Sequence, residues 1–404
     1  MTPPAPRIDS LDVIRGVAVM GILVANLPAF GLPEAAYFSP LAWGGSAGWD
    51  RFAWFATYVL VEGKMRGLFS MLFGASMLLV VDRARAAGDS PAGIHYARMA
   101  TLFAIGCAHL YLIWWGDILS HYALVGAIAF VFVALPVRPL VWLAFLFVAV
   151  QAVIGAETTL AAFAAAARNT PAKVETWTLI ASVFGQPPRA DLLGEVAAMR
   201  GGIGPGIVWR WAHATSPFAL LPLVGAETLG YMLIGMAGLK SGFLTGRWSR
   251  GRYAWIALVA IGATLPIDML LAFASIVHGF DQRWIVLGSV GAATVLRPLT
   301  FTGYAALLML TMRPAGWLTT RIAAAGRAAF TNYLGTTILM TFVFDGWGLG
   351  LFGALPRATL YLFVLPVWAV MLAWSRPWLA RYRFGPLEWG WRTIARLEVQ
   401  PWQR

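Results

Sequence analysis

Apolar stretches separated by short polar loops run along almost the whole chain. A helix that crosses a bilayer needs about 20 mostly apolar residues, and ten stretches are of this kind. Their approximate bounds are 13–30, 52–81, 99–115, 121–136, 139–161, 215–239, 253–276, 284–310, 322–344 and 357–378. This pattern predicts an all-α, polytopic membrane bundle of about ten transmembrane helices that forms a single domain over residues 1–404.

The stretch 52–81 is too long for one straight crossing and carries charged residues in its middle. Glu62, Lys64 and Arg66 lie there. An interrupted helix is tolerated in a membrane only where protein or a cavity surrounds the break. We therefore expect a broken helix, two short helices or a re-entrant segment.

Two further segments are not expected to cross the membrane. Segment 162–213 is predicted to form a helical cap on the outer face, between spans five and six, and segment 379–404 is predicted to be cytosolic or interfacial. The first span follows a Pro-rich start and has no small-residue cleavage site behind it. It is therefore predicted to be a retained span rather than a signal peptide.

Composition and charge agree with a membrane protein. Hydrophobic residues make up 59% and charged residues 12% of the chain, whereas soluble domains carry about 45–50% and about 25%. With the N-terminus inside, 17 Lys and Arg residues fall on the inner side and eight on the outer side. Because cytoplasmic loops carry the excess of basic residues, both termini are expected in the cytoplasm. The net charge of +12 then reflects orientation in the bacterial cytoplasmic (inner) membrane, among membrane lipids, and nucleic acid is not an expected partner.

Several ionisable residues fall inside the predicted spans. Each costs about 2.5–3.5 kcal/mol on the insertion scale unless it is paired or lines a cavity. These residues are Glu62, Lys64, Arg66, His109, Glu227, Asp268, Arg297 and Arg327. They predict a polar interior, either as pairs that only join helices, such as Glu62 with Arg66 at i,i+4, or as a functional site.

The first span carries Asp12, Arg15 and Asn26 at helical spacing. These residues share one face, so an acid and a base at the inner mouth line up with an amide near the outer end. The alternative is that Asp12 caps the helix and Arg15 only extends toward the interface.

The third span carries Arg98 and His109 on one face and leads into Asp117 and His121. Asp117 and His121 are four residues apart and are expected to meet on one helical turn. A His whose tautomer is fixed by a carboxylate or carbonyl can accept a proton from a hydroxyl. The alternatives are that His109 bonds a neighbouring helix and that Asp117 caps the fourth span. The five His residues lack metal-binding spacing and Cys107 is the only cysteine, so no metal site is expected.

Basic residues also collect on the predicted inner side. They are Arg83, Arg85, Arg98, Arg247, Arg250, Arg252, Arg313 and Arg321. These residues are either only the orientation signal or a site for a cytosolic polyphosphate, which Lys64, Arg66 or Arg297 would complete.

Together these stretches resemble the YeiB-like family of bacterial membrane proteins, domain-of-unknown-function family 418, from end to end. The matching residues are Arg7-Ile-Asp-Ser-Leu-Asp12-Val-Ile-Arg15-Gly16, Gly21 to Asn26, Glu62-Gly-Lys64, Leu68 to Gly74, His109, Trp115 to Leu119, Tyr122-Ala, Gly326, Thr331-Asn-Tyr333, Gly385 to Trp389 and Trp391-Arg392. The resemblance implies a polytopic membrane fold and carries no assigned reaction.

The first span is also distantly similar to membrane acyltransferases, both the sugar O-acetylating family three and the heparan-glucosaminide N-acetyltransferase type. Those proteins carry Leu-Asp-x-x-Arg-Gly with a His or Asn eleven residues after the Arg, and Arg15 and Asn26 match that spacing. The likeness implies cytosolic acyl-coenzyme A, a central tunnel and a catalytic His. The chain departs from the pattern because Asn26 stands where family three has its His and segment 31–50 contains no His.

The leading hypothesis is therefore an acyltransferase that moves an acyl group from cytosolic acyl-coenzyme A to a hydroxyl or amine of an envelope glycan, lipid or small metabolite. His109 is the expected general base, chosen by residue chemistry, with Asp117 or a nearby carbonyl orienting it and Asn26 polarising a carbonyl. The residues expected to bind the donor are Asp12, Arg15, Lys64, Arg66 and Arg297.

Two other classes remain open. In a transporter or lipid flippase the same charges would line a pathway through the membrane, and in a membrane scaffold or sensor they would be purely structural. The small residues from Ala324 to Ala329 suggest a homodimer contact, although packing between spans of one chain accounts for them equally well.

Overall fold

The computed structural model describes residues 9–403, and within that range it is helical apart from loops and a single β-bridge between Tyr382 and Gln403. Arg7 and Arg404, which contribute to the predicted charge asymmetry, lie outside the described residues. The predicted all-helical, polytopic bundle is confirmed.

The predicted spans coincide with the apolar helical segments of the structure. Eight segments among the described residues are long and apolar enough to cross a membrane: Asp9–Gly31, Gly48–Ala87, Pro91–Ile113, Val137–Ala165, Pro217–Lys240, Arg250–Val277, Gln282–Thr311 and Arg357–Arg381. The other two predicted spans correspond to shorter apolar helices, Leu119–Phe132 and Ala329–Phe344. By length and composition, eight helical segments of the described chain can therefore cross a membrane, and the count of ten spans stays a prediction.

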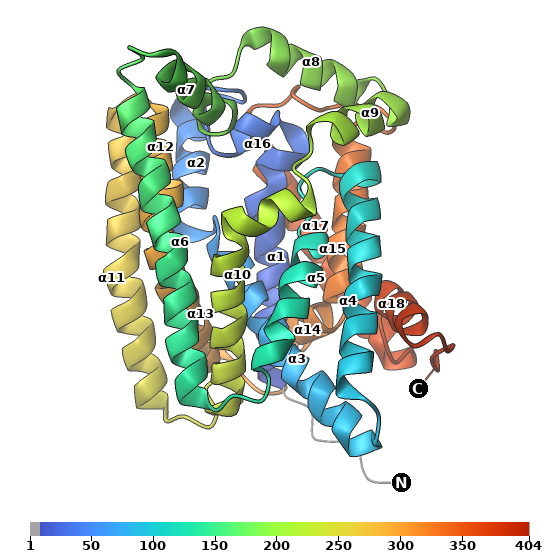
Figure 1. Ribbon diagram of the computed structural model, residues 1–404. Helices are drawn as coiled ribbons and strands as arrows, with labels where there is room; N and C mark the ends of the chain where they lie inside the picture. Colours follow the sequence, from blue (N-terminus) through green and yellow to red (C-terminus); the bar gives the residue numbers. More distant parts are fainter. Residues whose placement is uncertain (1–8, 404) are drawn as a thin grey trace.

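Breaks and turns divide these segments into the helices of Figure 1. The first half of the chain contributes α1 (Asp9–Gly31), η1 (Glu34–Tyr37), α2 (Gly48–Leu60), α3 (Lys64–Ala87), α4 (Pro91–Ala108), η2 (His109–Ile113), α5 (Leu119–Ala129), η3 (Phe130–Phe132) and α6 (Val137–Ala165). The second half contributes α10 (Pro217–Lys240), α11 (Arg250–Val277), α12 (Gln282–Val286), η4 (Leu287–Ala292), α13 (Ala293–Thr311), α14 (Trp317–Arg327), α15 (Ala329–Phe344), α16 (Arg357–Leu360), η5 (Tyr361–Phe363) and α17 (Val364–Arg381).

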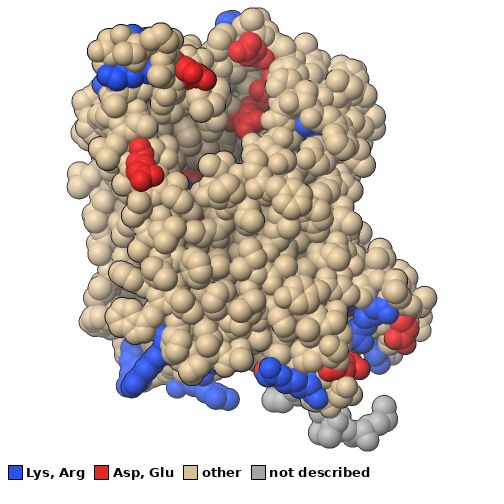
Figure 2. Space-filling view, viewed as in Figure 1, with Lys and Arg blue, Asp and Glu red and all other residues tan. Residues whose placement is uncertain are grey.

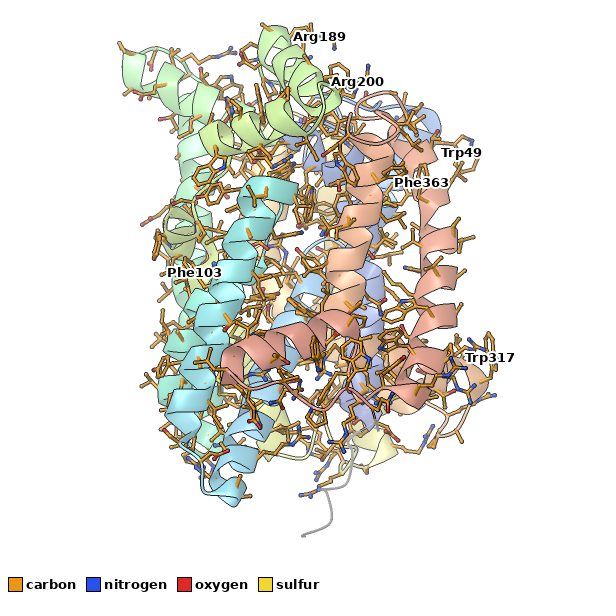
Figure 3. All side chains as sticks on the ribbon, turned by 90° about the vertical axis from the view of Figure 1, so that its right-hand side faces the viewer. Trp49, Phe103, Arg189, Arg200, Trp317 and Phe363 are labelled. Carbon is orange, nitrogen blue, oxygen red and sulfur yellow. The ribbon has the colours of Figure 1, made fainter. Side chains whose placement is uncertain are left out.

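The two segments that were not expected to cross form helices at opposite ends of the bundle. Segment 162–213 contains α7 (Pro171–Phe184), α8 (Arg189–Arg200) and α9 (Ile203–His213), which cover the upper end in Figure 1. Near the lower end α18 (Pro386–Arg396) lies crosswise over α4 and α15 (Figure 3). Lys and Arg side chains gather at this lower end (Figure 2). That the upper end faces the cell exterior stays a prediction.

Local sequence signals fix where several helices begin. The hydroxyls of Ser90, Ser216 and Ser249 each accept a hydrogen bond from the backbone three residues on, at 3.2, 3.2 and 3.4 Å. Pro follows Ser90 and Ser216, and its fixed φ suits the first helical position. These starts therefore follow from side-chain capping and do not depend on the bundle.

The stretch 52–81 is a broken helix, one of the three predicted forms. The chain leaves α2 at Leu60 and begins α3 at Lys64, and Gly63 between them has φ +68°. A Cβ atom on Gly63 would lie 2.0 Å from Nε of Arg297. Glycine is therefore required here both for the left-handed conformation and for the close approach of Arg297.

Glycines also set the closest helix crossings in the bundle. A Cβ on Gly74 of α3 would lie 2.0 Å from the carbonyl oxygen of Met232, and one on Gly235 of α10 would lie 1.7 Å from that of Met71. The two helices thus pack backbone against backbone, as small residues allow in membranes.

A similar crossing accounts for the small residues around Ala324 to Ala329. A Cβ on Gly326 would lie 1.9 Å from the carbonyl oxygen of Asp12, and one on Gly16 would lie 2.1 Å from that of Ile322. This stretch therefore packs against α1 of the same chain, which was one of the two alternatives that the sequence left open, and a homodimer stays a prediction.

We predict that Gly235→Ala lowers the melting temperature of the detergent-solubilised protein, because its methyl group would force α3 and α10 apart. Gly262→Ala in α11 is the matched control, since no atom lies within 4 Å of the Cβ position there. Thermal unfolding followed by tryptophan fluorescence measures both. Equal melting temperatures for the two variants would contradict the packing described here.

Candidate functional site

A cluster of charged side chains surrounds the break between α2 and α3. The guanidinium of Arg297 donates to both carboxylate oxygens of Glu62 at 3.0 Å and to Oε1 of Glu227 at 3.3 Å. Arg66 donates to the other oxygen of Glu227 in a short hydrogen bond. Three helices far apart in the sequence are thus joined through two arginines.

The remaining members complete the neutralisation of this cluster. Lys64 lies 3.0 Å from Asp268 of α11 and donates to the carbonyl oxygen of Tyr58 at 2.8 Å. The Tyr231 hydroxyl donates to Glu227 at 2.5 Å. With Glu62, Glu227 and Asp268 opposite Lys64, Arg66 and Arg297, the cluster has no formal net charge.

One sequence expectation about this cluster is wrong. Arg66 does not pair with Glu62 at i,i+4, because Glu62 precedes the first residue of α3 and therefore lies off its helical face. Lys64, Arg66 and Arg297 each pair with a carboxylate, and their expected binding of donor phosphates stays a prediction.

A separate buried pair joins His109 and Asp117. Nδ1 of His109 lies 2.8 Å from Oδ1 of Asp117, whose Oδ2 accepts from the backbone N–H of Ser120 at 2.9 Å and from its hydroxyl at 2.7 Å. A neutral His109 that donates from Nδ1 keeps the lone pair on Nε2. Nε2 has no hydrogen-bond partner among the described residues, and His109 is 1% exposed.

Local backbone geometry brings this pair together. His109 begins the π-helical turn η2, after which the chain turns back toward α5. Gly106 allows the backbone of Ser120 to approach α4, since a Cβ there would lie 2.2 Å from the Ser120 nitrogen. Trp114 stacks on Phe30 of α1 with ring centroids 4.2 Å apart, which holds the returning segment in place.

The predicted contact between Asp117 and His121 is wrong. Asp117 lies before the first residue of α5, so the helical i,i+4 geometry does not apply to it. His121 instead contacts Thr228 of α10, with 3.0 Å between Nε2 and Oγ1, and Thr228 also lies 3.4 Å from Arg66. His121 therefore borders the charge cluster.

The predicted pair on α1 is present. Arg15 donates to Asp12 at 3.1 Å and to the hydroxyl of Ser76 on α3 at 2.8 Å. Asn26 is half-buried, and its side chain makes no hydrogen bond with another residue that the structure describes. No hydrogen bond joins it to His109.

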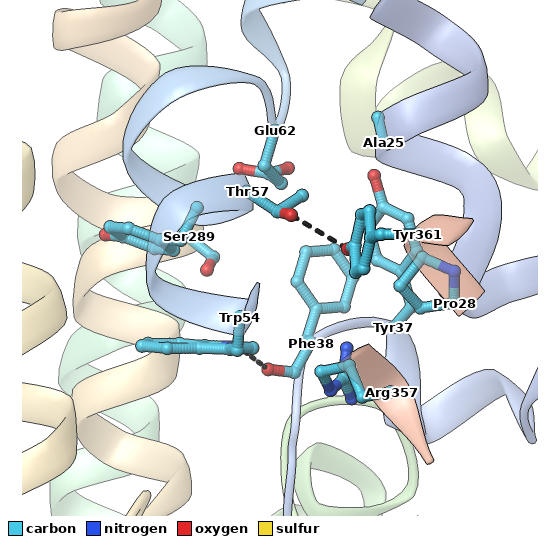
Figure 4. A pocket seen from close by; sticks show the side chains of 11 residues that line it. Ala25, Pro28, Tyr37, Phe38, Trp54, Thr57, Glu62, Ser289, Arg357 and Tyr361 are labelled. Atoms are coloured by element: carbon cyan, nitrogen blue, oxygen red, sulfur yellow. Dashed lines mark hydrogen bonds between the residues drawn. The ribbon is translucent and has the colours of Figure 1, made fainter. Parts of the chain in front are cut away.

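Sequence reasoning did not find a small cavity in the upper half of the bundle (Figure 4). Its space of about 20 Å³ is enough for one water molecule and is lined by Ala25, Pro28, Tyr37, Phe38, Trp54, Thr57, Tyr58, Glu62, Ser289, Arg357 and Tyr361. The carboxylate of Glu62 links this cavity to the charge cluster. Figure 2 also shows a hollow on the surface between the cap helices at the upper end. The sequence feature that could have indicated the cavity is Arg357, a charged residue at the start of the last predicted span. From the sequence alone it was counted only as part of the charge asymmetry.

Two carboxyl groups meet where the cap packs on η1: Glu195 of α8 is buried, and Glu34 of η1 is half-buried. Oε1 of Glu195 accepts from the backbone N–H of Glu34 at 2.9 Å. Burial, together with the nearby charge of Glu34, raises the pKa of Glu195 to about 8. Burial raises the pKa of Glu34 to about 7 despite the nearby charge of His213. Both carboxyl groups therefore stay protonated to a higher pH in the folded protein than an exposed carboxyl group does.

The bundle of apolar helices with a neutral polar interior defines a polytopic membrane protein. A family model described as a protein of unknown function, DUF418, matches residues 239–398. The chain is 32% identical over 397 residues to the uncharacterized protein YeiB of Escherichia coli K12, with 95% of each chain covered. It is 29% identical to the uncharacterized protein YxaH of Bacillus subtilis, with 98% of this chain and 96% of that protein covered. The chain therefore belongs to the YeiB-like DUF418 family, and no solved structure matches it.

We predict that Lys64→Met strongly destabilises the protein, because it leaves the carboxylate of Asp268 buried without its partner. Removing one member of a buried ion pair costs about 3–5 kcal/mol, whereas replacing both with apolar residues is often neutral. The double variant Lys64→Met/Asp268→Leu should therefore recover most of the melting temperature that the single variant loses. A single variant as stable as the wild type would show that the pair contributes nothing.

We predict that the cap loses stability as the pH rises. The folded pKa values of Glu34 and Glu195 lie above the ordinary value of 4.5. Their contribution is therefore complete below about pH 4.5 and is lost as the pH rises through about 7 to 8. The melting temperature should fall between about pH 5 and about pH 9, and Glu195→Gln should flatten this dependence. Glu175→Gln, at an exposed residue of α7, is the control, and an unchanged profile for Glu195→Gln would contradict the assignment.

Proposed function

We propose that this protein is a membrane acyltransferase of the bacterial cytoplasmic membrane. It moves an acyl group from cytosolic acyl-coenzyme A to a hydroxyl or amine of an envelope glycan, a lipid or a small metabolite. In this proposal the lower end of Figure 1 faces the cytoplasm. The observation that carries it is the buried His109, which is oriented by Asp117 and keeps a free Nε2.

His109 acts as the general base in this reaction. Nε2 takes the proton from the acceptor hydroxyl or amine as its oxygen or nitrogen attacks the thioester carbonyl carbon. When the tetrahedral intermediate collapses, the carbon–sulfur bond breaks and the coenzyme A sulfur receives the proton from the imidazolium. The carboxylate of Asp117 stabilises the imidazolium that forms between the two steps.

Polar groups on α1 support the same reaction. Asn26 has no hydrogen-bond partner among the described residues and is assigned to polarise the thioester carbonyl. Arg15, held by Asp12 and Ser76, is assigned to the donor phosphates. Lys64, Arg66 and Arg297 are assigned to hold the break between α2 and α3, since their charges are already compensated.

A transporter or lipid flippase is the second candidate, and a specific observation favours it. Broken helices with charged residues at the break are typical of transporter binding sites, and Glu62 lies at such a break beside a cavity. For a transporter, Glu62→Gln would abolish flux whereas His109→Gln would leave it intact. The pair of His109 with Asp117 supports transfer because a general base needs an oriented imidazole with a lone pair that is not already hydrogen-bonded, as on Nε2 of His109.

We predict that His109→Gln lowers acyl transfer about 100-fold or more, the scale of general base catalysis. The assay follows transfer of radiolabelled acetyl groups from acetyl-coenzyme A to an envelope extract by the full-length protein in proteoliposomes. Asp117→Asn should show a similar loss.

His95→Gln on the same helix is the control, because His95 is also buried but bonds only the carbonyl oxygen of Gly126. Melting temperatures of all variants show that they are folded. Wild-type transfer by a folded His109→Gln variant would overturn the proposed role of His109.

A further inference from the structure

α18 brings arginines of the C-terminal segment onto α4 at the lower end of the bundle. The guanidinium carbon of Arg98 lies 4.3 Å from the ring centroid of Trp391, and Nε1 of Trp391 donates to the carbonyl oxygen of Arg98 at 3.1 Å. Arg392 follows directly, and its guanidinium carbon lies 4.3 Å from the ring centroid of Phe384. Trp391 and Arg392 are neighbours on the crosswise helix α18 (Figure 3), so this helix brings Arg392 toward the Arg98 end of α4.

α1 and α3 add further arginines to the same place. Arg15 of α1 bonds Ser76 of α3, and Arg83 lies two helical turns beyond Ser76 on the same face. The pKa of Arg392 on α18 shows that the charge of Arg83 lies near it. Burial, and then the nearby charge of Arg83, lowers the pKa of Arg392 to about 10. The charge of Glu388 acts on this pKa in the opposite direction, and the charges of Arg396 and Arg15 act in the same direction as that of Arg83.

Few carboxylates compensate this arginine cluster, which comprises Arg15, Arg83, Arg98, Arg392 and Arg396. Asp12 pairs with Arg15. Glu388 accepts from the backbone N–H groups of Phe330 and Thr331 at 2.8 and 3.1 Å and so caps the start of α15. Across residues 9–403, no carboxylate lies within 4.0 Å of a guanidinium of the other four arginines.

We propose that the arginine cluster is a binding site for the phosphate groups of a ligand. Guanidinium groups bind phosphate through paired, charge-assisted hydrogen bonds, and an anion would relieve the repulsion between partly buried like charges. This inference rests on the proposed function, because it assigns the phosphates of the acyl donor to this cluster. Anionic phospholipid headgroups share the same chemistry.

The geometry of α4 connects the arginine cluster to the pair of His109 and Asp117. Arg98 and His109 are eleven residues apart, which places them on the same face at about 16 Å along the helix axis. Arg15 and Asn26 repeat this spacing on α1. A ligand with phosphates at the lower end and a long, flexible arm that ends in a reactive group would reach both levels, and coenzyme A thioesters have this form.

Binding of coenzyme A to the full-length protein in nanodiscs tests the proposal. Isothermal titration compares coenzyme A with pantetheine, which lacks phosphates, in discs of phosphatidylcholine. We expect coenzyme A to bind and pantetheine not to bind. The double variant Arg83→Gln/Arg392→Gln should weaken coenzyme A binding about tenfold or more.

The control variant is Arg376→Gln/Arg381→Gln, which removes the same charge from exposed residues near the end of α17 and should bind as the wild type does. If the double variant does not fold, Arg83→Gln alone at an exposed residue serves the same test. His109→Gln should retain coenzyme A binding. Binding without transfer would therefore remove the proposed function and leave the phosphate site standing.

A second arm separates the two phosphate sources. If the arginine cluster binds the acyl donor, replacing phosphatidylcholine with phosphatidylglycerol should shift the melting temperatures of the wild type and the double variant by the same amount. A rise in the wild type alone, without coenzyme A binding, would keep the phosphate site but assign it to a lipid headgroup. If neither coenzyme A nor phosphatidylglycerol distinguishes the double variant from the control variant, the proposal is overturned.

Discussion

Charges inside an apolar bundle must be neutralised, and this constraint shapes the centre of the structure. Each ionised side chain in the hydrocarbon costs about 2.5–3.5 kcal/mol on the insertion scale when unpaired, and six lie around the break between α2 and α3. Arg297 accordingly contacts Glu62 and Glu227 together, and Lys64 contacts Asp268. Gly63 permits this arrangement because a larger residue would occupy the place of the Arg297 guanidinium. The broken helix and the paired charges are thus one feature.

The charged side chains around the break between α2 and α3 pair with one another, whereas two other groups in the bundle are not fully paired. His109 differs from the charge cluster because only one of its nitrogens is used, whereas each charged side chain of the cluster lies within hydrogen-bond distance of an opposite charge. The arginine cluster beside α18 differs in the opposite sense, since positive charge there exceeds the nearby negative charge. In the proposed reaction α4 joins these two sites. The core side chains of Val19, Met99 and Leu102 lie between the two levels, so binding requires that they move aside.

Hydropathy alone located the apolar helices, because the requirement for about 20 apolar residues leaves a strong local signal. The pairing of charges was predicted poorly. Both i,i+4 expectations failed for the same reason: Glu62 and Asp117 each precede the first residue of a helix, so helical spacing does not apply to them. The actual partner of Glu62 is 235 positions away, and that of Arg66 is 161 positions away. Such pairs depend on the packing of whole helices, which a single sequence does not specify. From the sequence alone Asp117 was named as a group that could orient His109, and the structure brings these two residues together.

The most direct test of the central claim is an experimental structure of the full-length protein with a non-hydrolysable acetyl-coenzyme A analogue, determined by electron cryomicroscopy in nanodiscs. The account predicts density for the phosphates at Arg83, Arg98 and Arg392 and for the acyl end beside Nε2 of His109. An analogue bound elsewhere, or with its acyl end away from His109, would contradict the claim that α4 joins a donor site to a catalytic base.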